Sequence, residues 1–264
     1  MNRIDATFEN LAPRKEKALV GFVTAGDPNP DVSLQIIVSM CRAGLDVLEL
    51  GVPFSDPTAD GPVIQRSSAR ALKQGVSLGS VLALTRRIRA AVAIPIVLFS
   101  YYNPILSYGS DSFYRDALDA GADGLLVVDL PPEESSELTD GWPGNDLHLI
   151  RLVAPTTPPQ RVRHIAESAT GFLYLVSKTG VTGSDGLDTS DVGVKMRQLR
   201  EISALPICVG FGISTAAQVS AVAEVADGVV IGSAFERTIE THLETPDLPQ
   251  ILARQVAEYK AATR

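Results

Sequence analysis

The sequence predicts a single (β/α)₈ barrel over residues 1–264, and three observations support this fold class. Eight short runs of apolar and β-branched residues alternate with longer amphipathic stretches, which is typical of repeated βα units around a parallel sheet. The length of 264 residues fits the roughly 250 residues of such barrels. The phrase Ala-Gly-Leu-Asp at 43–46 returns as Ala-Gly-Ala-Asp at 120–123, and more weakly at 225–228.

The eight apolar runs are the expected strands. A glycine such as Gly44 or Gly121 just before a run commonly ends a helix that turns into a strand, so the repeated phrase supports the βα unit. In order along the chain, the expected strands cover residues 18–23, 47–50, 96–99, 124–128, 147–153, 172–176, 207–209 and 228–231.

Helical spacing of apolar residues fills the segments between these runs. Ile4, Phe8 and Leu11 share one face of an expected N-terminal helix that could cover the bottom of the barrel. The stretch between the second and third strands is longer than one helix needs, so we expect an additional helix there. The proline pairs at 131–132 and 158–159 fit helix starts. No linker-like segment divides the chain, which favours one domain.

Composition excludes several classes of protein. The formal net charge of −8 argues against a nucleic-acid binder, which would need clustered Lys and Arg. The longest apolar run, at 90–99, contains Pro95 and is shorter than the roughly 18 residues of a membrane span. No signal-peptide pattern begins the sequence. Cys41 and Cys208 lack metal or redox spacing and read as buried thiols, so we expect a cytoplasmic protein.

Glycine-rich loops follow the last three expected strands. They are the segment at 177–183, the sequence Gly-Phe-Gly-Ile-Ser at 210–214, and Gly232-Ser233. In a parallel barrel these loops meet at one face, where glycines let the backbone approach a phosphate and a short helix beginning at Ser233 points its N–H groups at the anion. Tight turns without a ligand are the alternative interpretation.

Three carboxylates lie within or shortly after the second expected strand. Glu49 lies within the apolar strand near its end, where burial would raise its pKa into a range useful for acid and base catalysis; a structural carboxylate is the alternative. Asp56 and Asp60 lie in the proline-rich loop that follows, and either could instead form a turn. Spacing alone does not choose between these two aspartates.

These residues resemble one family, the α subunit of tryptophan synthase. Its signature is similar to the run ELGVPFSDPTADGPVIQ at 49–65, and to FVTAGDP at 22–28. Tyr101 with Asn103, the segment VSKTGVTG at 176–183 and GFGIS at 210–214 extend the resemblance in order over most of the chain. Together these motifs are highly specific.

The resemblance implies a retro-aldol cleavage of indole-3-glycerol phosphate to indole and glyceraldehyde 3-phosphate, with no cofactor or metal in this chain. By the family pattern, Glu49 is the principal acid and base, and Asp60 is the partner of the indole nitrogen. Asp56 is left as a structural residue of the loop. The same pattern assigns further substrate contacts to Tyr174, Thr182, Gly183, Phe211, Gly212, Gly232 and Ser233, and an indole pocket to Phe22, Phe99, Leu126, Val128 and Leu152.

The resemblance also implies a partner. In the family, indole passes to a β subunit that carries pyridoxal phosphate, within a heterotetramer of two α and two β chains. The loop at 53–62 and the segment around Asn103 resemble the elements that face this subunit. Three alternatives are a free-standing lyase that releases indole, another phosphate-binding barrel such as an isomerase, and a barrel kept only to bind and activate a partner.

The remaining polar residues point to structural roles. The histidines His148, His164 and His242 are scattered, without the spacing of metal ligands. We expect Asp27 to belong to a turn and Asp129 to cap a helix. Arg151, within the fifth strand, must be solvated or find a partner towards the helix layer.

Overall fold

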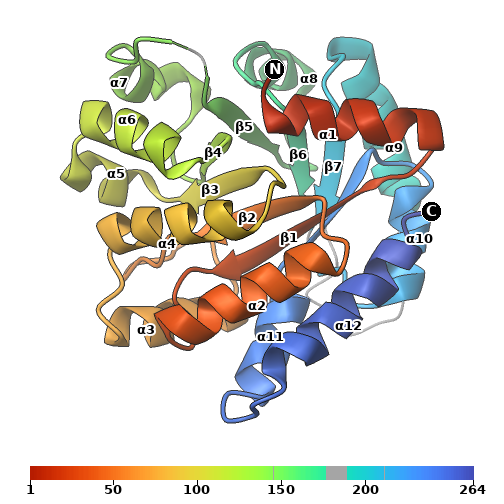
Figure 1. Cartoon of the computed structure of the whole chain (residues 1–264). Helices are drawn as coiled ribbons and strands as arrows, with labels where there is room; N and C mark the ends of the chain where they lie inside the picture. Colours follow the sequence, from red (N-terminus) through yellow and green to blue (C-terminus); the bar gives the residue numbers. More distant parts are fainter. Residues whose placement is uncertain (145, 177–188, 211) are drawn as a thin grey trace.

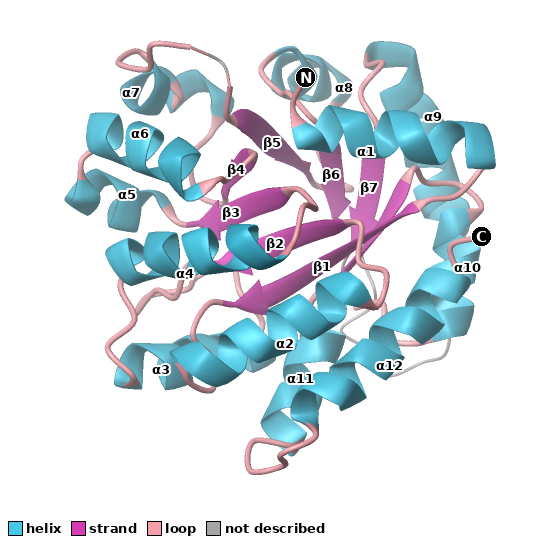
Figure 2. Cartoon of the chain, viewed as in Figure 1, coloured by secondary structure: helices cyan, strands magenta, loops and turns pink. Residues whose placement is uncertain are grey.

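The structure is a closed barrel of eight parallel strands in sequence order. It is a computed structural model that describes residues 1–144, 146–176, 189–210 and 212–264. Figure 1 shows the strands at the centre with helices from both ends of the chain around them, and Figure 2 shows the same arrangement by element type. The fold class predicted from the apolar runs is therefore confirmed.

Each strand pairs with its neighbours in the sequence, and β8 returns to β1, where Ala18 pairs with Gly228. All pairings are parallel, so the carboxyl ends of all eight strands meet at one face of the barrel. Every expected strand is present, with bounds that differ by no more than one residue at either end. The strands are β1 (Ala18–Thr24), β2 (Val47–Gly51), β3 (Ile96–Ser100), β4 (Gly124–Val127), β5 (His148–Val153), β6 (Leu173–Val176), β7 (Ile207–Gly210) and β8 (Gly228–Ile231).

Helices form the outer layer, and two of them lie between β2 and β3, as the length of that segment predicted. Within the described ranges, none of the helices is both long and apolar enough to cross a bilayer. The helices are α1 (Arg3–Leu11), η1 (Ala12–Arg14), α2 (Pro30–Arg42), α3 (Pro62–Lys73), α4 (Leu78–Ala91), α5 (Tyr102–Tyr108), α6 (Ser110–Ala120), η2 (Pro132–Glu134), α7 (Ser136–Thr139), α8 (Pro159–Glu167), α9 (Thr189–Ile202), α10 (Ala216–Ala223), α11 (Ser233–Thr241) and α12 (Leu248–Ala261).

Two apolar clusters fill the molecule, one between the strands and the helices and one inside the barrel. The inner cluster contains Val47, Leu126 and Phe172, and α1 contributes Ile4 and Leu11 to it. The N-terminal helix therefore closes the bottom of the barrel, as its apolar face predicted. Both cysteines are free and buried, which confirms the expectation for the thiols.

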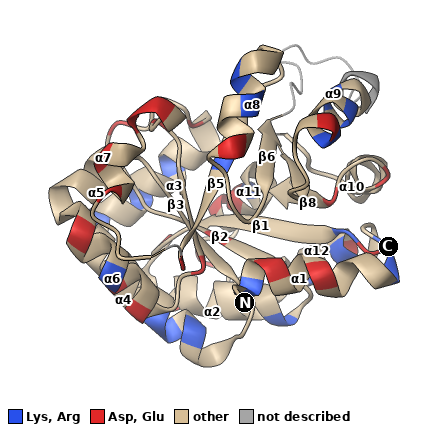
Figure 3. Cartoon of the chain, turned by 90° about the horizontal axis from the view of Figure 1, so that it is seen from above, with Lys and Arg blue, Asp and Glu red and all other residues tan. Residues whose placement is uncertain are grey.

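Charged residues belong mainly to the outer helices and loops, whereas the strands contain few of them (Figure 3). Arg151 is an exception, since it belongs to β5 and is only 6% exposed. Its guanidinium donates hydrogen bonds to the carbonyl of Leu130 and the hydroxyl of Ser135, so the partners predicted for it are neutral oxygens towards the outer layer. Asp129 accepts a hydrogen bond from the N–H of Tyr102 and so caps the start of α5.

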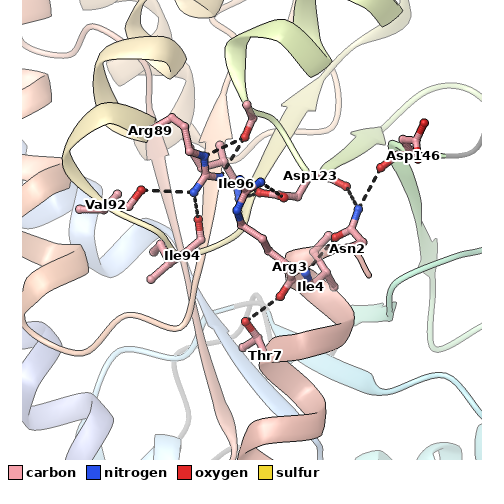
Figure 4. Close-up of polar contacts among 11 residues, drawn as sticks. Asn2, Arg3, Ile4, Thr7, Arg89, Val92, Ile94, Ile96, Asp123 and Asp146 are labelled. Carbon is pink, nitrogen blue, oxygen red and sulfur yellow. Dashed lines mark hydrogen bonds and ion pairs between the residues drawn. The ribbon is translucent and has the colours of Figure 1, made fainter.

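Asp123, just before β4, anchors the N-terminal helix to the barrel (Figure 4). Its carboxylate accepts hydrogen bonds from Arg3 at 2.8 Å, from Arg89 at 2.7 Å and from the N–H of Ile96 at 2.8 Å. Its backbone carbonyl accepts a further bond from the side chain of Asn2, which also caps α1. One buried carboxylate thus joins α1, α4 and the start of β3.

Replacing Asp123 with alanine should lower the free energy of unfolding by about 2–4 kcal/mol. The change leaves the guanidinium of Arg89, which is 16% exposed at its side chain, and the N–H of Ile96 without their acceptor. Urea denaturation measures the loss. Asp31→Ala is the matched control, because the Asp31–Arg87 pair is largely exposed and should contribute less than about 1 kcal/mol. Equal losses from both variants would contradict the anchoring role of Asp123.

Candidate active site

A cavity of about 530 Å³ opens at the carboxyl ends of the strands and collects most of the residues predicted for the site. Apolar side chains and backbone form most of its wall, as in many small-molecule sites. The predicted residues that line it are Phe22, Glu49, Asp60, Phe99, Val128, Leu152, Tyr174, Gly212, Gly232 and Ser233. Residues from β1, β2, β3, β5, β6 and the loops beyond them therefore converge on one space.

Glu49 lies within β2 at the floor of this cavity and is 1% exposed. Its Oε1 atom has no hydrogen-bond partner among the residues that the structure describes. Burial raises the pKa of Glu49 to about 8, as the apolar strand around it predicted. The carboxyl group is therefore largely protonated at neutral pH, and it faces the space that a substrate would occupy.

Two glycines make room for the aromatic rings beside Glu49. A side chain at Gly51 would meet the ring of Phe22, with 2.6 Å between its Cβ and Cζ of the phenylalanine. Gly210 plays the same part for Tyr174, because a Cβ there would overlap the hydroxyl of this tyrosine. Phe22 also packs edge-on against Phe99, with ring centroids 5.1 Å apart. The cavity thus has aromatic walls fitted to a flat apolar group.

Asp60 lies in the loop between β2 and α3, at the mouth of the cavity, and is half-buried. Burial raises the pKa of its carboxyl group, and a hydrogen bond with Tyr101 opposes the shift. The hydroxyl of Tyr101 also accepts the N–H of Ala59 at 3.0 Å, so this tyrosine at the end of β3 holds the loop. The structure thus separates the two aspartates that spacing could not: Asp60 lines the cavity, whereas Asp56 bonds to Ser55 and lies outside it.

The opposite end of the cavity is formed by backbone at the start of α11. This helix begins at Ser233 with Gly232 as its N-cap, and no side chain of the described residues caps it. The N–H groups of its first turn therefore have no side-chain acceptor at the N-cap among the described residues, and Gly232 and Ser233 bring this end of the helix dipole to the cavity. Gly212 lies nearby with a φ of 74°, in the left-handed region that favours glycine. Such a surface is suited to an anion.

Among the described residues that were predicted for the site, Leu126 does not line the cavity. It is fully buried in the inner apolar cluster, so its observed role is packing. Thr182, Gly183 and Phe211 lie outside the described residues.

Arg237 is a lining residue that the sequence reading missed. The sequence did contain a sign of this role. Arg237 is four residues after Ser233, and residues four apart lie on the same face of a helix. It is the one Lys or Arg among the lining residues in the part of the chain that the structure describes. Tyr101 was noted only as part of a motif, although it positions the loop of Asp60.

The cavity combines three chemical capacities. A protonated carboxyl group can deliver a proton at its floor, a second carboxylate at its mouth can accept a hydrogen bond or stabilise a cation, and open N–H groups at its far end can hold an anion. Among the described residues, His, Cys, Asp and Glu form no group of three or more that could hold a metal ion.

Comparisons with known proteins agree on one family. The family model described as tryptophan synthase alpha chain matches residues 8–263. Tryptophan synthase alpha chains of Desulfosudis oleivorans and Desulfatibacillum aliphaticivorans are 63% and 60% identical to this chain, over the full length of each pair. The crystal structure of tryptophan synthase subunit alpha from Legionella pneumophila superposes with a TM-score of 0.92 at 40% identity, covering 100% of this chain and 98% of the other.

Replacing Glu49 with glutamine should stabilise the fold, because the substitution removes a carboxyl group whose pKa is raised by burial. A pKa raised from 4.5 to about 8 means that wild-type stability falls as pH rises through this interval. The gain in the free energy of unfolding should therefore be small at pH 4.5 and about 2–4 kcal/mol at pH 8. Denaturant titrations at both pH values measure it. A gain that is equal at the two pH values would show that Glu49 is not the buried acid.

Proposed function

Because this chain belongs to the tryptophan synthase alpha chain family, we propose that Glu49 and Asp60 perform the family's reaction in the cavity described above. The chain is a carbon–carbon lyase of tryptophan biosynthesis, which cleaves indole-3-glycerol phosphate to indole and glyceraldehyde 3-phosphate. The proposal concerns which residues do this work. It rests on one observation above all, the buried carboxyl group of Glu49 at the cavity floor, whose Oε1 atom has no hydrogen-bond partner among the described residues.

Glu49 delivers its proton to C3 of the indole ring, and the ring then carries positive charge at its nitrogen. The carboxylate of Asp60 stabilises that charge through the ring N–H. The Glu49 carboxylate next removes the proton of the glycerol hydroxyl, an aldehyde forms, and the electrons of the broken carbon–carbon bond return to the ring. One proton has moved from the hydroxyl to C3, and Glu49 is protonated again.

The substrate spans the cavity from one end to the other. Its phosphate binds at Gly212, Gly232 and the first turn of α11 from Ser233, supported by the open N–H groups there. Its ring lies between the carboxyl groups of Glu49 and Asp60. The aromatic and aliphatic wall that holds the ring consists of Phe22, Phe99, Val128, Leu152 and Tyr174, with Leu126 packed behind it. Phe211 and Gly183 complete the phosphate site and Thr182 contacts Asp60 in this proposal.

The family implies a β-subunit partner for the chain. We propose that indole passes to this subunit, that the subunit carries pyridoxal phosphate, and that two α and two β chains form the cytoplasmic enzyme. Residues 1–264 act in it as one barrel domain. The loop at 53–62 and the start of α5 lie at the same end of the barrel as the cavity, where they could meet such a partner.

Replacing Glu49 with glutamine should lower kcat for indole release by about 10²- to 10⁴-fold, with KM changed little, because the amide keeps the shape of the carboxyl group but delivers no proton. In the wild type, kcat should fall as pH rises through about 8, where Glu49 loses its proton. Indole release is measured with and without the cognate β chain. Glu9→Gln, an exposed glutamate on α1, is the matched control.

Each alternative gives a different result in this experiment. Full activity of Glu49→Gln would exclude Glu49 as the acid, and an unchanged activating effect on the β chain would indicate a barrel that only binds its partner. High activity together with no complex on size-exclusion chromatography would indicate a free-standing lyase. No indole from the wild type would indicate a different phosphate-binding barrel.

Replacing Ser233 with aspartate should raise KM at least about 30-fold without lowering stability. A carboxylate at the first residue of α11 repels the substrate phosphate by about 2 kcal/mol, yet it interacts favourably with the helix dipole. Steady-state kinetics and thermal unfolding measure the two effects. Ser77→Asp places the same charge at the N-cap of α4, outside the cavity lining, and should leave KM unchanged. If both variants raise KM alike, the phosphate does not bind at α11.

A further inference from the structure

A second buried carboxyl group lies behind the first turn of α11. Glu236 is three residues beyond Ser233 on this helix and is completely buried. Its Oε1 atom accepts the N–H of Thr24, the last residue of β1, at 2.6 Å. Its own N–H donates to the carbonyl of Gly232, the N-cap of the helix, at 3.1 Å. Glu236 therefore joins the start of α11 to the carboxyl end of a barrel strand.

Glu236 interacts with the buried carboxylate of Asp27. Both oxygens of Asp27 accept hydrogen bonds from Arg70 on α3, each at 2.8 Å, so the residue expected only in a turn forms a buried ion pair. The Oε2 atom of Glu236 has no N–H or O–H donor in the described part of the chain. Two negative charges so close together would repel each other. Asp27 is already paired with Arg70, so the repulsion is avoided when Glu236 carries a proton and donates it to Asp27.

The same cluster reaches α3, which begins directly after the loop that carries Asp60. The hydroxyl of Thr24 lies 2.7 Å from that of Ser67 on α3, and Ser67 donates to the carbonyl of Ile64, a residue of the cavity wall. Arg70 also bonds to Glu240 on α11 at 3.1 Å. Glu236 and its partners thus fix α11, β1 and α3 relative to one another.

We propose that Glu236 is a positioning residue of the phosphate site: its proton, shared with Asp27, holds the first turn of α11 in place, and loss of that proton weakens phosphate binding. The inference rests on the proposed binding of phosphate at α11. Ionisation places a negative charge one helical turn from Ser233 and repels Asp27, so the N–H groups of the turn lose both favourable potential and alignment.

The charges around Glu236 support this behaviour. Burial first, and then repulsion from Asp27, raise the pKa of Glu236 to about 8, although the hydrogen bonds from Thr24 and the charge of Arg70 act in the opposite direction. Arg70 pairs directly with Asp27, which places the proton on Glu236. Helix α12 packs against α11 next to Glu236 through the ring of Tyr259, which contacts Phe235. This contact places no charge beside Glu236.

Binding of glycerol 3-phosphate to Glu49→Gln tests the proposal, because this background removes the other acid with a pKa near 8. Isothermal titration calorimetry should show Kd rising about tenfold between pH 7 and pH 9, since each pH unit above the pKa costs a factor of ten. The double variant Glu49→Gln/Glu236→Gln should show less than a twofold rise, because the amide can both accept from Thr24 and donate to Asp27 at every pH. Glu49→Gln/Glu244→Gln, which changes an exposed glutamate beyond α11, should keep the tenfold rise.

Three results would overturn the proposal. They are a flat Kd in the Glu49→Gln background, an equal rise in the Glu236→Gln double variant, and the absence of a protonated carboxyl band that titrates near pH 8 in the infrared spectrum of Glu49→Gln. The infrared measurement remains decisive even if the double variant fails to fold. None of these measurements requires turnover, so they do not test the catalytic roles of Glu49 and Asp60. If glycerol 3-phosphate does not bind at all at pH 7, the proposed phosphate site itself is wrong.

Discussion

Closure of the parallel ladder is the constraint on which the rest of the molecule depends. Because β1 pairs with β8, no strand edge is left open, and every strand must point its carboxyl end to the same face. Loops that are far apart in the sequence are thereby brought to one mouth, with Asp60 on one side and Ser233 on the other. The opposite end of the barrel does not contribute to the cavity. There α1 covers the barrel with apolar side chains, and Asp123 holds this helix through Arg3.

Much of this arrangement could be predicted because it is local in the sequence. Eight apolar runs, and a glycine before several of them, identify strands and helix ends through backbone preferences that act within a few residues. Glu49 could be recognised as a candidate because burying a carboxylate within an apolar strand costs folding free energy. The polar cluster of Glu236, Asp27 and Arg70 could not be found this way, since Thr24 and its acceptor are 212 positions apart. Asp27 was read as a turn residue for the same reason.

The two buried acids show how one physical effect serves two purposes. Burial raises the pKa of both Glu49 and Glu236 to about 8. Glu49 lines the cavity, and its Oε1 atom has no hydrogen-bond partner among the described residues, so a substrate bound there would meet its proton. Glu236 is enclosed by protein groups, so its proton serves the contact between elements. Because the pKa of each carboxyl group is raised in the folded state, both lower the stability of the fold at neutral pH.

Closure of the barrel also has a consequence for synthesis on the ribosome. The first strand, ALVGFVT, is buried along its whole length in the folded protein. One of its two neighbouring strands, β8 at residues 228–231, is synthesised roughly 200 residues later. At about 5–20 residues per second, this interval lasts roughly 10–40 s. During that time the edge of β1 that later pairs with β8 has no partner strand within its own chain.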